Sequence, residues 1–191
     1  MRQKEDKMNF KLHMVCGKDD LRPAMTNILV TKEFCVATDS HTMAIVPTSD
    51  IFSYQESIDR IPEEGIYVNA NDWRKLITAN FISYDGEFIV AHFPRKSPAH
   101  VKPIEIKDIG PFPNWKAVLP SSERFDSVSK IGVNPKFMYN LHQALDMPIF
   151  KLDFISENAV ISVSIPEFGY GLDCGHQFGI VMPAIILKEN D

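Results

Sequence analysis

Long hydrophobic runs, a secretory signal and disulfide-type cysteine patterns are all missing from this sequence. No apolar run approaches the ~20 residues that a membrane-spanning helix needs. The first seven residues mix both signs of charge and contain no apolar stretch, unlike a secretory signal. The three cysteines are an odd number without a Cys-x-x-Cys pair, which favours reduced thiols over a disulfide framework or a zinc ribbon. We therefore expect a cytoplasmic protein with no membrane partner.

Signatures of catalysis and of cofactor binding are missing as well. The chain has no Walker loop, Gly-x-Ser-x-Gly, His-Glu-x-x-His or dinucleotide-binding fingerprint. Residues 173–176 (Asp-Cys-Gly-His) include metal-ligand types, but no second pair lies at the spacing that a metal site needs. Asp39 and His41 have neither a nucleophile nor a third orienting group with them. The sequence predicts no enzyme, no cofactor and no metal; an enzyme whose site has no known signature stays an alternative.

Positive charge is scarce and scattered. The 191 residues carry a net charge of −5 at pH 7 and are 45% apolar, which is typical of one or two globular domains. Arg74 and Lys75 fall together in one predicted helix, Lys136 begins another, and Lys151 falls in a predicted strand. The simplest interpretation is a solvated helix surface. One basic face on an acidic body is the alternative, and it would suit nucleic acid.

The first third of the chain contains a predicted hairpin. Residues 35–47 hold two β-favouring apolar runs around Asp39-Ser40, a pair that tolerates the positive φ of a two-residue turn. Residues 9–16 alternate apolar and polar side chains, which predicts a half-buried strand. Residues 28–30 favour another strand, and a short proline-led helix within residues 22–30 is the alternative.

Two later stretches repeat one order of elements: a strand, a helix and further strands. In the first, Asn69 or Asn71 can cap a helix over residues 72–80, and Asp85-Gly86 predicts a hairpin turn. In the second, Asn134-Pro135 supplies an N-cap and a first-turn proline for a helix over residues 136–146. The strands predicted around these helices cover residues 66–68, 81–84, 87–93, 101–106, 130–133, 150–155, 159–165 and 178–186.

The predicted fold class is α+β. A β-rich start is followed by two βαβββ units, a repeat of about 65 residues. We expect a disordered leader over residues 1–8 and one domain over residues 9–120, made of the halves 9–64 and 65–120. A third half follows over residues 121–191, and its polar, serine-rich beginning marks the boundary.

Five short motifs follow an order that is more specific than a β-protein requires. They are the runs Arg22–Met25, Ala37–His41, Phe112–Pro120, Ile131–Phe137 and Ile180–Pro183. In the same order, they resemble Arg-x-x-Leu, Ala-Thr-Asp-Gly-His, Phe-Pro-Asp-Tyr-x-x-Val-Ile-Pro, Ile-Gly-Phe-Asn-x-x-Tyr and Val-Met-Pro of one family. That family is the bacterial sliding clamp, the β subunit of the replicative DNA polymerase III. The resemblance covers nearly the whole chain after the leader.

The resemblance implies a DNA-clamp-like fold of repeated βαβββ units, with antiparallel sheets outside and helices on one face. In the family, a groove between the middle and last domains takes short linear motifs of polymerases and repair proteins. The matching groove residues here are Thr38, His41, Met43, Pro120, Val181, Met182 and Pro183. The helix face would bring Arg74, Lys75 and Lys136 nearest to duplex DNA. The other interpretation is that the groove residues only pack two units together.

The chain also departs from the family pattern. It has about half the family's length, and Ser40 and Thr42 replace the Gly and Arg of the family's hairpin. The predicted function is a non-enzymatic, clamp-like DNA replication accessory, a processivity factor. It would form a homo-oligomer, hold duplex DNA without sequence specificity, and bind a linear motif of a polymerase or repair partner. The alternative is a clamp-fold peptide-binding adaptor that does not encircle DNA.

Overall fold

The computed structural model describes residues 9–119, 131–154, 156, 159–166 and 172–184, and within them the chain has the predicted α+β fold. The strands are β1 (Asn27–Val30), β2 (Phe34–Thr38), β3 (Thr42–Pro47), β4 (Ile66–Asn69), β5 (Phe81–Tyr84), β6 (Ile89–Phe93), β7 (Lys96–Val101), β8 (Ile104–Glu105), β9 (Lys151–Phe154), β10 (Ile161–Ser164) and β11 (Phe178–Val181). The α-helices are α1 (Gln55–Asp59), α2 (Ala70–Leu76), α3 (Ile106–Ile109) and α4 (Pro135–Leu145). The 3-10 helices are η1 (Leu12–Met14), η2 (Pro23–Thr26), η3 (Thr48–Asp50), η4 (Trp115–Val118) and η5 (Leu172–Cys174).

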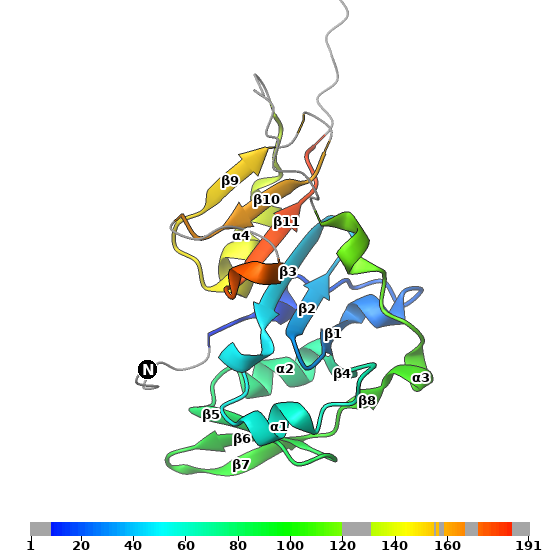
Figure 1. Cartoon of the computed structure of the whole chain (residues 1–191), viewed down its shortest axis with the longest axis vertical. Helices are drawn as coiled ribbons and strands as arrows, with labels where there is room; N and C mark the ends of the chain where they lie inside the picture. The colour runs from blue at the N-terminus through cyan, green and yellow to red at the C-terminus, as the bar shows by residue number, and fades with distance from the viewer. Residues whose placement is uncertain (1–8, 120–130, 155, 157–158, 167–171, 185–191) are drawn as a thin grey trace, which may run out of the picture.

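Eight of these strands form one continuous antiparallel sheet in the order β8-β4-β1-β2-β3-β11-β10-β9. The join that matters for function is β3 with β11, because it brings two distant parts of the chain together. Met43 lies opposite Ile180, and Thr42 lies opposite Val181. Strands β11, β10 and β9 therefore extend, beyond β3, the sheet that the first part of the chain forms (Figure 1).

The large sheet has a hydrophobic core on each face. On one face η1, α2 and α4 pack against the strands and bury Trp73 and Leu141 (Figure 1). On the other face the segment from β8 to η4 covers Leu29, Tyr67 and Ile45. Since alternate residues of a strand point to opposite faces, covering both faces explains why every residue of β1, β2 and β3 is buried.

The remaining strands form a three-stranded sheet in the order β5-β6-β7. Helix α2 contacts β1 and β4 of the large sheet and β6 and β7 of the small one, so it lies between the two sheets. The predicted Asp-Gly hairpin joins β5 to β6. Asp85 Oδ1 accepts the backbone N–H groups of Glu87 and Phe88 at 2.8 and 2.7 Å, and Gly86 has a φ of +104°.

Both predicted helices have an asparagine N-cap, and of the two candidates for the first helix the cap is Asn69. Asn69 Oδ1 accepts the backbone N–H of Asn71 at 2.9 Å, so α2 begins two residues before the predicted start. Asn134 Oδ1 accepts the N–H of Lys136 at 3.0 Å, with proline in the first turn of α4.

The predicted strand over residues 9–16 is wrong. This segment contains the 3-10 helix η1, and its two fully buried residues, Leu12 and Val15, are three positions apart. The indole Nε1–H of Trp73 donates to the Phe10 carbonyl at 2.8 Å. The segment is therefore held against α2. The alternation of apolar residues predicted a strand, but the residues that are fully buried follow a helical spacing.

Two other predicted strands are broken. Residues 101–106 do not form one strand, because β7 ends at Val101 and β8 holds two residues before α3 begins. Pro103 lies between them and has no N–H for a ladder hydrogen bond. The described part of the predicted strand at residues 130–133 is a single bridge between Gly132 and Ala184. The proposed leader and the proposed boundary after residue 120 lie outside the described residues, so that division of the chain stays a prediction.

Candidate binding sites

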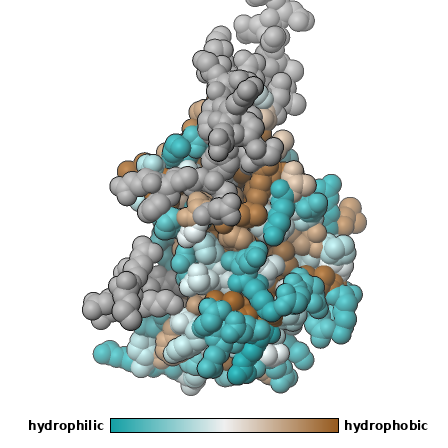
Figure 2. Space-filling view, viewed as in Figure 1, coloured by the Kyte–Doolittle hydropathy of each residue, from teal (hydrophilic) through white to brown (hydrophobic). Residues whose placement is uncertain are grey.

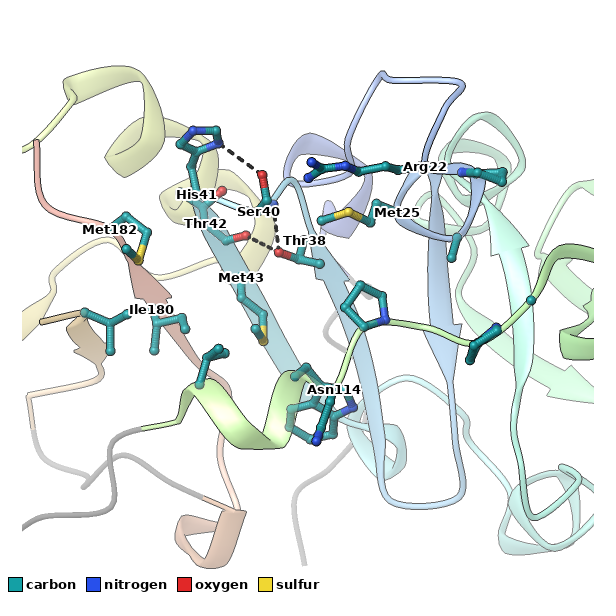
Figure 3. Close-up of a pocket in the computed structure, with 18 of the residues that line it drawn as sticks. Arg22, Met25, Thr38, Ser40, His41, Thr42, Met43, Asn114, Ile180 and Met182 are labelled. Atoms are coloured by element: carbon teal, nitrogen blue, oxygen red, sulfur yellow. Dashed lines mark hydrogen bonds between the residues drawn. The ribbon is translucent and has the colours of Figure 1, made fainter.

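An apolar cavity of about 560 Å³ lies on the sheet face opposite α2 and α4. Its walls come from distant segments: the β2–β3 hairpin, the connector between Ile109 and Val118, and β11 with the following Met182 (Figure 3). The run Arg22–Met25 closes the remaining side. In Figure 2, apolar side chains are visible on this face beside hydrophilic ones.

The hairpin wall is held by its own side chains. Asp39 Oδ1 accepts the backbone N–H groups of His41 and Thr42, at 2.9 and 2.7 Å, and the Thr42 hydroxyl at 2.9 Å. The Thr38 hydroxyl donates to the Thr42 carbonyl at 2.8 Å. The turn residues are Ser40 and His41, one position later than predicted, because the Asp39 carboxylate bonds ahead to the turn as aspartate commonly does. These four hydrogen bonds hold the shape of this wall from within the hairpin.

The tip of the hairpin touches the segment after β11. The Met182 N–H donates to the His41 carbonyl at 2.8 Å, and the His41 ring centroid lies 5.4 Å from that of Phe137 in α4. Met182 itself is 41% exposed. The early Thr-Asp-Ser-His turn and the late Met-Pro segment are therefore neighbours in space.

The buried part of this cavity is apolar. Met43, Ile180 and Trp115 line it and are nearly inaccessible to solvent, and Trp115 packs edge-on against Phe34 with ring centroids 6.1 Å apart. Figure 3 shows Met43 and Ile180 side by side below the hairpin. Because a thioether side chain adapts to different shapes, these walls suit an aliphatic or aromatic anchor.

The predicted groove residues divide into three groups. Thr38, His41, Met43 and Met182 line the cavity together with residues of the connector. Val181 and Pro183 do not: Val181 is fully buried in the core on the helix side of the sheet. Since Ile180 points into the cavity, its neighbour in the strand must point away. Pro120 lies outside the described residues.

Sequence reasoning named only Pro120 of the connector as a groove residue. It missed Ile109, Trp115 and Val118, which line the cavity, and also Arg22 and Met25. Both segments carry motifs by which the chain resembles the clamp family, and these motifs were the only indication in the sequence that the segments contribute to the site. Their place beside the hairpin depends on tertiary packing, which no local pattern contains.

A second cavity, of about 610 Å³, opens on the helix face. It lies among η1, the segment between η1 and η2, α2 and the start of α4. Four residues, Arg22, Met25, Ser40 and His41, line both cavities and form a shared wall. We call these two spaces the apolar cavity and the helix-face cavity.

Two of the three predicted DNA-facing residues line the helix-face cavity. They are Arg74 in α2 and Lys136 in α4. Lys75 does not line it; its ammonium forms an ion pair with Asp72 at 2.5 Å. His13 also lines this cavity, and burial, then the charges of Arg74 and Lys11, lower its pKa to about 4. The ring is therefore uncharged at neutral pH.

Two of the three cysteines, Cys16 and Cys35, are buried core residues. Burial raises the pKa of the Cys16 and Cys35 thiols to about 12, so neither is a reactive thiolate at neutral pH. Within the described residues, no group of three or more His, Cys, Asp or Glu side chains is placed to hold a metal ion. In the same part of the chain, no helix is long and apolar enough to cross a membrane.

Comparison with known proteins gives a result at the level of the fold. No protein-family model and no curated protein matches the sequence. Solved structures match along nearly the whole chain: the DNA polymerase III β subunit of Borrelia burgdorferi superposes with a TM-score of 0.61 at 13% identity and covers 94% of this chain. The chain has the fold of the bacterial sliding clamp.

Two more clamps give the same result. The Caulobacter crescentus β subunit has a TM-score of 0.63 at 15% identity over 94% of this chain, and the Bartonella birtlesii clamp has 0.60 at 14% over 94%. This chain spans 63–64% of the length of these clamps. It therefore has the fold of a shortened clamp, as the resemblance of its motifs predicted.

Proposed function

We propose that the protein is a non-catalytic, clamp-like replication accessory that binds a short linear peptide motif in the apolar cavity. The observation that carries this proposal is the meeting of the hairpin, the connector and β11 around one apolar space on the outer sheet face. A peptide anchor of Leu or Phe type fits such walls. Of the solved clamps with the same fold, one is in complex with a natural product and another is bound to griselimycin.

The peptide proposal is tested at Met182, on the exposed rim of the apolar cavity. We expect Met182→Asp to weaken binding of a fluorescein-labelled hexapeptide with a central Leu-Phe pair about tenfold, because a charge replaces apolar contact worth about 1.4 kcal/mol. Fluorescence anisotropy with the full chain measures this. Ile149→Asp is the matched control, since Ile149 is 67% exposed and does not line the cavity.

A wild-type chain that binds the peptide no better than its Ala-Ala version would contradict the proposal. Equal weakening by Met182→Asp and Ile149→Asp would also contradict it. Affinity in the micromolar range is expected, because the interface is small.

The second part of the proposal is duplex DNA held loosely against the helix face by phosphate contacts. Arg74 and Lys136 face that side, and Lys75 lies beside them on α2. If three phosphates are neutralised, affinity for a 20-base-pair duplex should fall about 40-fold between about 50 and about 200 mM salt. Binding should not depend on sequence. Anisotropy at the two salt concentrations measures both, and no binding at the lower one would exclude this part.

Self-association of the chain would complete a clamp-like ring, and the outer strands β8 and β9 of the large sheet have unpaired edges within the described structure. The alternative, a peptide-binding adaptor that does not encircle DNA, is favoured by the net charge of −5 and by the few cations on the helices. Sedimentation separates the two. A concentration-independent oligomer supports the clamp, and a monomer at high concentration supports the adaptor.

A further inference from the structure

Three methionine side chains line the apolar cavity, and one of them is open to solvent. Met25 and Met43 are buried, whereas Met182 is 41% exposed on the rim. The other methionines of the described residues are buried or partly buried; they are Met14, Met138 and Met147. Of the sulfur atoms in this cavity, that of Met182 is therefore the one that a dissolved oxidant reaches.

The backbone of Met182 is held in place, so a chemical change in its side chain does not have to disturb the fold. Its N–H donates to the His41 carbonyl at 2.8 Å, and β11 immediately before it pairs with β3. Met182 belongs to neither hydrophobic core of the described residues. Figure 3 shows its side chain between His41 and Ile180 on one wall of the cavity.

Oxidation of this sulfur changes the chemistry of the rim. Hydrogen peroxide transfers one oxygen atom to a thioether: the O–O bond breaks, an S=O bond forms and water leaves. The sulfur is oxidised by two electrons, and the peroxide is reduced. The product is a polar sulfoxide with a hydrogen-bond acceptor in place of an apolar group. A peptide anchor that covers the rim must remove water from this oxygen, which weakens binding.

We propose that Met182 is a site of reversible oxidation that controls the apolar cavity. The thioether form binds an apolar anchor, and the sulfoxide form binds it about tenfold more weakly. The oxidant is a peroxide. A methionine sulfoxide reductase restores the thioether with a dithiol as electron donor, and water and a disulfide are the other products. The effect on peptides rests on the proposed function, whereas the selectivity of oxidation rests on the exposure of Met182.

The first readout is the oxidation itself. The full chain is treated with dilute hydrogen peroxide, digested and mapped by mass spectrometry. We expect the sulfoxide of Met182 to form at least about fivefold faster than those of Met25 and Met43, because these two sulfur atoms are buried. Thermal unfolding checks that the oxidised chain stays folded.

The second readout is the affinity for the Leu-Phe hexapeptide, measured by anisotropy before and after oxidation. We expect a loss of about tenfold, and recovery after treatment with the reductase and dithiothreitol. Met182→Leu has no sulfur on the rim, so peroxide should change this variant's own affinity less than about twofold. Met138→Leu is the matched control, since Met138 does not line the cavity and this variant should lose affinity as the wild type does.

A third readout does not need a peptide. Anilinonaphthalene sulfonate has a fused apolar ring that suits the cavity and an anionic group that can pair with Arg22 on its wall. We expect oxidation to weaken binding of this fluorescent dye to the wild type and to leave its binding to Met182→Leu unchanged.

The outcomes separate this proposal from the proposed function. Peptide binding that survives full oxidation of Met182, or oxidation of Met25 and Met43 as fast as that of Met182, overturns the oxidation site and leaves the peptide function standing. Equal loss in the wild type and Met182→Leu overturns it too. If the untreated wild type binds no peptide, the peptide function fails. Dye binding that oxidation weakens only where Met182 is present then supports the oxidation site, and any other dye result overturns it.

Discussion

The Trp73→Ala variant is expected to lose about 3–5 kcal/mol of unfolding free energy, the usual cost of removing a large buried aromatic side chain. Trp73 is fully buried on α2. The helix lies between the two sheets, and the indole also donates to the Phe10 carbonyl at 2.8 Å. Removing the side chain opens a cavity in the main core and leaves that carbonyl without its donor.

Urea denaturation followed by circular dichroism measures this loss, and Trp73→Phe is the matched variant. Phenylalanine keeps most of the apolar contact and removes the hydrogen bond, so we expect a loss of about 1–3 kcal/mol. If alanine prevents folding altogether, the phenylalanine variant still gives a number. A loss below about 1 kcal/mol for alanine would contradict the placement of Trp73 at the centre of this core.

Gly179→Ala is expected to destabilise the protein by about 2 kcal/mol or more, although it adds a single methyl group. A Cβ at this position would lie 2.7 Å from the Met43 carbonyl oxygen, 2.9 Å from Leu141 Cδ2 and 3.1 Å from Leu145 Cδ1. The first contact is with backbone of the neighbouring strand and the others are with α4, so the strand, the helix or both must move. Since Met43 lines the apolar cavity, peptide binding should weaken as well.

Gly17→Ala is the control for this variant. A Cβ on Gly17 would meet Met25 Cβ at 3.4 Å, an ordinary contact, and Gly17 does not have a positive φ. We expect its unfolding free energy to stay within about 0.5 kcal/mol of the wild type. Equal urea midpoints for the two variants would show that α4 does not approach β11 as closely as the structure indicates.

Local chemistry made much of the fold predictable from the sequence. Asparagine residues such as Asn69 and Asn134 indicate the start of a helix, because each side chain can accept the free N–H groups of a first turn. Asp85-Gly86 predicts its hairpin because glycine accepts the positive φ that the turn needs. In each case the information lies within a few residues, so no tertiary contact is required to interpret it.

The errors arose where tertiary packing decides. Alternation between Phe10 and Cys16 fits a strand, but burial of Leu12 and Val15 follows a helical spacing that only α2 and α4 impose. For the candidate site, the run Ile180–Pro183 was correctly placed beside the hairpin, yet which of its residues point inward depends on the register of β11 against β3. Trp115 could not be assigned to the cavity from the sequence, because its position depends on how the connector crosses the sheet.

The pairing of β11 with β3 protects an edge of the sheet that proteolysis would expose. Removal of the residues after 130 by a protease would turn β3 from an interior strand into an open edge, because the alternate N–H and C=O groups of β3 that face β11 would lose their partners. Such an edge is a template for pairing with another chain. We therefore expect the shortened fragment to aggregate. In the whole chain, β11 covers the edge of β3 and prevents this pairing.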